Sequence, residues 1–223
     1  MTYAIEVSNL RKKVKQFQLN DVSFSLPTGT IMGFVGENGA GKTTTIKCIL
    51  NLLKKDAGTI KLFGVNSTDD NLAIKEQIGV VLDDIHFPES LTPQQINKFL
   101  QKTYINWNPP YYFELLKQLK VPINKPIKEF SRGMKMKLSI TIALAHHPNL
   151  LILDEPTSGL DPIVRDEILD LFLEFMQDEN HSILFSSHIT SDLEKIADYI
   201  TFIHEGEILF SENKDDLLYE LGI

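Results

Sequence analysis

A glycine-rich loop between an apolar run and a helical pattern constrains the fold of this chain most. Residues 36–43 read Gly-Glu-Asn-Gly-Ala-Gly-Lys-Thr and follow the apolar run 31–35. Glycines let backbone N–H groups converge on phosphate oxygens in conformations that other residues adopt only at a cost. Apolar residues then recur at helical spacing, at Ile46, Ile49, Leu50 and Leu53. The loop therefore opens a helix, whose N-terminal dipole favours an anion.

This arrangement predicts a nucleotide site. Lys42 supplies a positive charge to the β- and γ-phosphates, and the Thr43 hydroxyl is suited to ligate Mg²⁺. An ordinary glycine-rich turn is the alternative, but the flanking strand and helix argue against it. The predicted nucleotide-binding residues are Gly36, Glu37, Asn38, Gly39, Ala40, Gly41, Lys42, Thr43 and Thr44.

Composition narrows the class of protein. A length of 223 residues with 43% hydrophobic residues suits one α/β domain, with or without a smaller insert. The net charge of -8 argues against a polyanionic partner, so no nucleic acid is expected. The single cysteine, Cys48, excludes an intramolecular disulfide. We expect no signal peptide, and no run approaches the ~18 to 20 apolar residues that cross a bilayer.

Short apolar segments separated by helical patterns predict a largely parallel sheet. Val22, Phe24 and Leu26 alternate with serines, which is typical of a half-buried strand. Further strands are expected at residues 59–63, 78–82, 150–153, 183–185 and 199–203. Helical patterns at 163–176 and 191–197 imply crossover connections between the later strands. A strand pair around Glu205-Gly206 and a short helix near Leu217 complete the chain.

Residues 92–145 show no strand pattern. One helix is expected after Thr92, which has the capping partners Pro93 and Gln95, and others at 111–119 and 133–145. We interpret this segment as a helical subdomain, residues 85–146 approximately, inserted into a single domain of residues 1–223. Its aromatic residues are expected to form a small core, with a docking surface as the alternative: Trp107, Tyr111, Tyr112 and Phe113.

Two acids end the apolar strand at 150–153. Asp154, at the carboxyl end of the strand, is placed to ligate Mg²⁺. Glu155 beside it can polarise an attacking water, and we assign it the role of general base. Two solvated acids that merely terminate a strand are the alternative interpretation.

These motifs resemble, over nearly the whole chain, those of the ATP-binding subunits of bacterial ABC transporters. Ser158-Gly159-Leu160-Asp161 is similar to the family's D-loop, and His188 to its switch histidine. Phe130-Ser131-Arg132-Gly133-Met134 stands where the family's signature motif stands, before a helix that leads to the acidic pair. The resemblance implies an α/β fold: a P-loop NTPase core with a mostly parallel sheet, an N-terminal antiparallel β portion and an inserted helical subdomain.

The resemblance also implies a function. It implies an ATPase that uses ATP and Mg²⁺, with Thr43 and Asp154 as metal ligands and Glu155 and His188 as catalytic residues. It implies an integral-membrane permease subunit as partner, which places the chain at the cytoplasmic face of the membrane. ATP binding is expected to close a head-to-tail dimer with a second ATP-binding subunit, and hydrolysis to reopen it. One chain then presents its signature to the other chain's nucleotide, through Ser131, Arg132, Gly133 and Met134.

The chain departs from the family pattern at several positions. The signature lacks the usual glutamine and adds the charge of Arg132, a form similar to a bacterial subgroup that reads Tyr-Ser-Lys-Gly-Met. Asp83 stands where the family's Q-loop carries glutamine. Val14 occupies the place expected for the aromatic residue that stacks on adenine. Phe17 is a possible substitute, although its position in a strand favours a core role.

Two further groups of residues, a basic run and a pair of adjacent histidines, are given structural interpretations. A basic run at Arg11, Lys12, Lys13 and Lys15 is typical of a solvated face, with nucleotide contacts as the alternative. The pair His146-His147 has no acidic or cysteine ligand nearby in sequence, so no metal is expected there.

Rival functions leave motifs unexplained. A small-molecule kinase does not account for the elements at Ser131, Asp161 and His188. An ABC protein that acts on nucleic acid or ribosomes generally carries two cassettes or long coiled coils, and this sequence shows neither.

Overall fold

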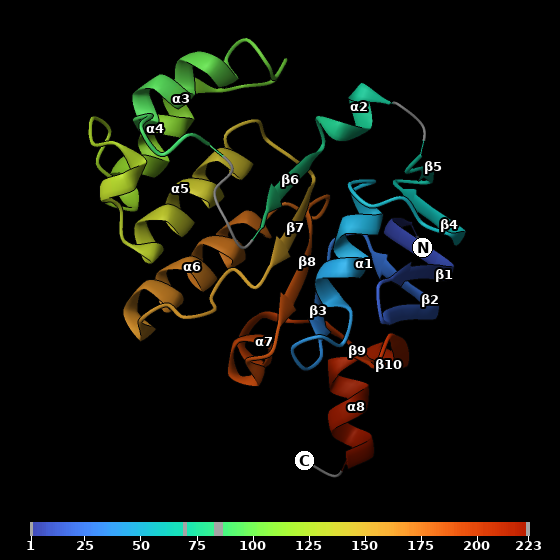
Figure 1. Cartoon of the computed structure of the whole chain (residues 1–223). Coiled ribbons are helices and arrows are strands. Elements are labelled where there is room, and N and C mark those ends of the chain that lie inside the picture. Colours follow the sequence, from blue (N-terminus) through green and yellow to red (C-terminus); the bar gives the residue numbers. More distant parts are fainter. Residues whose placement is uncertain (1, 69–70, 83–86, 222–223) are drawn as a thin grey trace.

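Two β-sheets form the frame of the molecule in Figure 1, a computed structural model that describes residues 2–68, 71–82 and 87–221. The antiparallel sheet has the order β2-β1-β4-β5, and its strands are β1 (Tyr3–Val14), β2 (Phe17–Pro27), β4 (Ala57–Leu62) and β5 (Val65–Asn66). The second sheet has the order β10-β9-β3-β8-β7-β6, and its strands are β3 (Ile31–Val35), β6 (Ile78–Val81), β7 (Leu150–Asp154), β8 (Ser182–Ser187), β9 (Tyr199–His204) and β10 (Glu207–Asn213). All its neighbours pair in parallel except β9 and β10. This arrangement confirms the predicted fold class.

The helices connect and cover these strands. In Figure 1, α3, α4, α5 and α6 lie on the side of β6, β7 and β8 that faces away from the antiparallel sheet. The helices are α1 (Lys42–Ile49), α2 (Leu72–Lys75), α3 (Pro93–Leu100), α4 (Pro109–Gln118), α5 (Arg132–Leu144), α6 (Pro162–Phe175), α7 (Thr190–Ile196) and α8 (Lys214–Leu221), with a short 3-10 helix η1 (Ile127–Glu129). Every helix and strand that the sequence pattern predicts is present, with ends shifted by a few residues.

Alternate residues of the central strands pack on opposite faces of the larger sheet. In β7, Leu151 and Leu153 join the apolar cluster on the side of the helices, whereas Leu150 and Ile152 join the cluster beneath the antiparallel sheet. Successive side chains of a strand point to opposite faces. Both faces of β7 are therefore covered, which explains why the strand reads as an uninterrupted apolar run.

The helical segment between β6 and β7 shares its core with the sheet. Trp107 and Tyr112 are buried in the same cluster as the β7 residues, and Trp107 Nε1 donates a 2.8 Å hydrogen bond to Asn97 Oδ1. These aromatic residues therefore form core, as expected. The capping box is also confirmed, because Thr92 Oγ1 accepts from Gln95 N and Gln95 Oε1 accepts from Thr92 N. The division of the chain at residues 85 and 146 stays a prediction.

Strands β1 and β5, helix α2 and the 3-10 helix η1 were not predicted from the sequence. The register of β1 against β2 shifts between Val7 and Leu10 and again between Leu10 and Lys12. Such irregularities break the alternation of apolar and polar residues that marks a strand. Helix α2 is a single turn, too short for a periodic signal.

The basic run lies on the antiparallel sheet and is paired with acids. Arg11 makes two 2.6 Å hydrogen bonds to the Asp21 carboxylate, and Lys12 Nζ lies 2.8 Å from Asp56 Oδ1. These contacts agree with a solvated face. Among the helices that the structure describes, none is long and apolar enough to cross a membrane.

Candidate nucleotide-binding site

The glycine-rich loop connects β3 directly to α1. Gly39 and Gly41 have φ angles of 87° and 118°, in the left-handed region that favours glycine. A Cβ on Gly41 would also lie 2.7 Å from Leu19 Cδ2 and 2.9 Å from Phe17 Cζ, so no larger residue fits. No side chain caps the N-terminus of α1. Its first N–H groups are thus left for an anion, as the sequence predicts.

Lys42, Glu155 and His188 meet at the end of this loop. Lys42 Nζ donates to the carbonyl oxygens of Gly36 at 2.7 Å and Glu37 at 3.1 Å, and lies 3.2 Å from Glu155 Oε1. His188 Nδ1 lies 2.5 Å from Glu155 Oε2. Because β3, β7 and β8 are parallel neighbours, their carboxyl ends bring these residues to one edge of the sheet. The predicted cation, base and histidine therefore form one connected group.

Asp154 is held by the neighbouring strand. Its side chain is 2% exposed, and Oδ1 accepts a 2.7 Å hydrogen bond from Ser186 Oγ on β8. Ser186 also fixes the next residue, because its Oγ and its carbonyl oxygen both accept from Glu155 N, at 3.0 and 3.2 Å. Glu155 itself has a φ of 53°, an uncommon conformation for a residue with a side chain. The serine thus sets the direction of both acids.

The donor set fits Mg²⁺ that arrives with a nucleotide. Mg²⁺ is usually held by one or two protein oxygens together with phosphates and waters, rather than by a cage of side chains. Asp154 offers a buried carboxylate, and Thr43 lines the cavity beside the phosphate loop. Within the described residues, no group of three or more His, Cys, Asp or Glu could hold a metal alone. Asp154 and Thr43 are therefore the residues here that would hold such an ion.

A cavity of about 520 Å³ surrounds these groups, within the usual size of a small-molecule site. It is lined by Val14, Phe17, Asn38, Gly39, Gly41, Lys42, Thr43, Thr44, Arg132, Glu155, Ser158 and His188. Six of the nine predicted phosphate-loop residues therefore face one space with Glu155 and His188, whereas Gly36, Glu37 and Ala40 are not among the lining residues. The four residues of the basic run are not among those that line it.

Phe17 lies at the edge of this cavity with Val14. The ring is half-buried and packs against the apolar cluster of the antiparallel sheet, as expected of a core residue. It also lines the cavity and approaches the phosphate loop at Gly41. Phe17 therefore contacts both the core and the cavity, so core packing does not account for all of its contacts.

The predicted signature and D-loop residues begin two helices. Ser131 caps α5, with Oγ accepting from Met134 N at 3.2 Å, and Asp161 caps α6, with Oδ1 accepting from Val164 N at 3.0 Å. The Ser131 hydroxyl still has its own proton to donate. Among the signature residues Ser131, Arg132, Gly133 and Met134, only Arg132 lines the cavity of its own chain, and of the D-loop segment only Ser158 does. Asp83, at the position of the family's Q-loop glutamine, lies outside the described residues.

A buried network behind the site was missed by the sequence reasoning. Asp192, on α7, is 1% exposed; its Oδ2 accepts a 2.7 Å hydrogen bond from Thr157 Oγ1 and its Oδ1 lies 3.4 Å from Arg165 Nε. These residues tie together α6, α7 and the loop after Glu155. Their separation in sequence gives no local signal that they meet.

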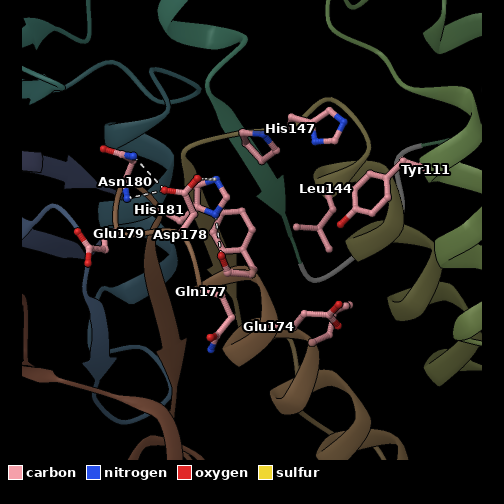
Figure 2. Close-up of a pocket in the computed structure, with 12 residues that line it drawn as sticks. Tyr111, Leu144, His147, Glu174, Gln177, Asp178, Glu179, Asn180 and His181 are labelled. Atoms are coloured by element: carbon pink, nitrogen blue, oxygen red, sulfur yellow. Dashed lines mark hydrogen bonds and ion pairs between the residues drawn. The ribbon is translucent and has the colours of Figure 1, made fainter.

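A larger hollow lies elsewhere, and its acidic lining does not favour a phosphate. It holds about 740 Å³, and Figure 2 shows Asp178, Asn180 and His181 gathered on one side of it and Tyr111 on the other. Its lining residues are Tyr111, Leu144, His147, Pro148, Leu171, Glu174, Phe175, Gln177, Asp178, Glu179, Asn180 and His181. The charged residues among them are acids, without a lysine or arginine. A polyanion is repelled here and attracted to the cavity of Lys42.

The two adjacent histidines have structural contacts. His146 is 1% exposed, stacks on Tyr104 and has a pKa lowered by burial. His147 stacks on Tyr111 and lies 2.9 Å from Asn108 Nδ2. Both histidines therefore have stacking partners within the helical segment.

Comparison with known proteins agrees with this geometry. Residues 19–158 match the model of the family described as ABC transporter. The bacitracin transport ATP-binding protein BcrA of Bacillus licheniformis is 36% identical over 213 residues, which are 94% of this chain and 69% of that protein. The lantibiotic transport ATP-binding protein SrtF of Streptococcus pyogenes is 36% identical over 214 residues, covering 95% and 91% of the two chains.

Solved structures show the same fold. An ATP-binding subunit of an ABC transporter superposes with a TM-score of 0.87 at 28% identity, covering 98% of this chain and 93% of the other. A dimeric ATP-binding cassette with bound ADP and phosphate superposes with a TM-score of 0.82 at 20% identity, covering 94% and 98%, which compares the fold alone. The kinase alternative finds no support in these relatives. The chain belongs to the ABC transporter family, as one of its ATP-binding ATPase domains.

Proposed function

We propose that this chain hydrolyses Mg·ATP to drive a separate membrane permease, from the cytoplasmic face of the membrane. The observation that carries the proposal is the contact of Lys42, Glu155 and His188 at the end of the phosphate loop. The names of its relatives, which are transport ATP-binding proteins, support the transport role. Purification from membranes, with phosphate release from ATP as the activity readout, tests it. An ATPase that co-purifies with no membrane protein contradicts the transport part.

The charges in the cavity suggest how the nucleotide is received. In the structure Glu155 is the carboxylate that neutralises Lys42, whose side chain is 5% exposed. A γ-phosphate takes over Lys42 as counter-ion and leaves the Glu155 carboxylate to accept a proton from water. His188 keeps Glu155 oriented through their hydrogen bond. Asp154 and Thr43 would hold Mg²⁺, which would neutralise phosphate charge when bound.

A second ATP-binding subunit is proposed as partner. Ser131 is exposed at the start of α5, and neither it nor Gly133 is among the residues that line the cavity of their own chain. A helix N-terminus with a hydroxyl is a good anion donor. This arrangement supports a head-to-tail dimer in which Ser131, Gly133 and Met134 act across the interface.

The permease is proposed to dock in an apolar groove of about 470 Å³ that lies between the sheets and the helical segment. Ile74, Val80 and Tyr104 line it. Two apolar side chains stand exposed here: Leu52, which lines the groove, is 64% exposed, and Ile105, which follows Tyr104, is 77% exposed. An amphipathic helix of the permease suits such a groove.

Charge in this groove is expected to uncouple the chain from the membrane. Leu52→Glu and Ile105→Glu place carboxylates where an apolar helix docks, and each should reduce the amount retained on permease-containing membranes about tenfold or more. ATP binding should be unchanged. Leu209→Glu is the matched control, since Leu209 is a 59% exposed leucine on β10, outside the groove. Equal retention of all variants refutes this docking site.

Phe17 is expected to hold adenine. Phe17→Ala should weaken binding of ATP and ADP equally, by roughly fivefold, because the base is common to both and stacking contributes ~1 to 3 kcal/mol. Val14→Tyr should tighten ATP binding by about tenfold for the same reason. Calorimetric titration measures both. Phe210→Ala, which removes a ring of the stacked pair Phe202 and Phe210, serves as control. Unchanged affinity in a folded Phe17→Ala variant would leave Phe17 with only its packing role.

A further inference from the structure

Arg132 reaches the cavity of its own chain. It is the first residue of α5, next to Ser131, and its side chain lines the same space as Lys42, Glu155 and His188. Glu155 and His188 mark the end of the cavity where a terminal phosphate lies in the proposed function. The two neighbours therefore differ, since Ser131 caps its helix and does not line this cavity.

The guanidinium of Arg132 lies next to Gly159. A Cβ on Gly159 would lie 2.7 Å from Arg132 Nη1 and 3.1 Å from Cζ. The guanidinium thus lies against the bare Cα of Gly159, in the loop that follows Glu155. Ser158, the preceding residue, lines the cavity as well. A side chain at position 159 would displace the guanidinium from this place.

We propose that Arg132 binds the terminal phosphate of the ATP held by its own chain, and so favours ATP over ADP. This inference rests on the proposed nucleotide site. A guanidinium makes two parallel hydrogen bonds to phosphate oxygens, which suits a terminal phosphate better than the point charge of a lysine. ADP lacks the group that Arg132 contacts. The signature segment thus acts on both nucleotides of a dimer, through Arg132 on its own chain's site and through Ser131 on its partner's.

Nucleotide binding by the monomer tests the proposal. Titrations of MgATP and MgADP are made at a protein concentration where light scattering gives a single chain, which removes any contact across a dimer. Arg132→Ala is expected to weaken ATP binding about tenfold and ADP binding less than twofold. Arg132→Lys keeps the charge without the paired hydrogen bonds, and should restore part of the affinity. Arg132 is exposed, so these variants should stay folded.

A matched pair of glycine variants separates displacement of the Arg132 guanidinium from backbone strain. Gly159→Ala should mimic Arg132→Ala, because its methyl group pushes the guanidinium away. Gly64 has a similar φ of 77°, and a Cβ there meets no described atom within 4 Å. Gly64→Ala therefore carries the same backbone cost and should bind ATP as the wild type does.

The outcomes distinguish this inference from the proposed function. If monomeric Arg132→Ala binds ATP as tightly as the wild type, while Lys42→Ala does not bind, the nucleotide site is right and the role of Arg132 within its own chain is wrong. If the wild type itself fails to bind ATP, the proposed function fails first. Equal loss of ATP and ADP affinity in Arg132→Ala also overturns the proposal, because the contact then is not to the terminal phosphate.

Discussion

Replacing Lys42 with alanine is expected to abolish ATP binding and, with it, ATP-dependent dimerisation. Lys42 is buried between the phosphate loop and Glu155, and it supplies the positive charge that faces the β- and γ-phosphates. Its loss leaves Glu155 in the cavity without that cation, so a polyanion meets a carboxylate instead. Calorimetric titration with MgATP should show no binding at concentrations that saturate the wild type.

A second lysine on the same helix provides the control. Lys47 is exposed in the last turn of α1, away from the cavity. Lys47→Ala removes an equal charge and should leave ATP binding unchanged. Circular dichroism should show that both variants keep the wild-type helix content. ATP affinity of wild-type strength in Lys42→Ala would mean that the loop does not cradle phosphate in the way we describe.

Local patterns in the sequence predict much of this molecule. The strand, loop and helix around Lys42 follow from adjacent residues, because glycine conformations and helical spacing act over a few positions. The capping box at Thr92 follows from the same kind of short-range rule. The order of motifs along the chain was enough to indicate the family, which the relatives confirm.

The contacts that shape the site are long-range and carry no local signal. Ser186 holds Asp154 because β7 and β8 are neighbours, although the residues lie 32 positions apart. Asp192 bonds Thr157 from a distance of 35 positions. A pattern of spacing predicts which face of an element is buried, but not which polar group of another element it meets. The hydrogen bond between Glu155 and His188 also joins residues that are distant in sequence, so only the folded structure reveals it.

Arg132 illustrates how the fold can alter an interpretation from sequence. By resemblance, the signature segment is assigned as a whole to the partner's nucleotide. The helix start places the Ser131 hydroxyl at a cap, while the next side chain lies over Gly159 toward its own cavity. Adjacent residues of the motif therefore have different surroundings, because successive positions at the start of a helix point in different directions: Arg132 lines the cavity and Ser131 does not.

Glu155→Gln is expected to lower ATP turnover by roughly 10²-fold or more, the scale of a positioned general base. The amide has the shape of the carboxylate but cannot accept a proton from water. ATP affinity should be kept or tightened, because the carboxylate that pairs with Lys42 and competes with the phosphates for it is gone. ATP bound without turnover should hold the dimer closed, so gel filtration with MgATP should show a dimer that the wild type loses as it hydrolyses.

Glu174→Gln separates this effect from a general loss of charge. Glu174 is an exposed acid in the hollow of Figure 2, so its variant should turn over ATP as the wild type does. The fold should tolerate Glu155→Gln, since the backbone N–H at this position keeps its hydrogen bonds to Ser186. The kinetics decide the assignment: phosphate release at the wild-type rate in Glu155→Gln means that another group accepts the proton. A slow variant that also fails to bind ATP means that Glu155 acts in binding instead.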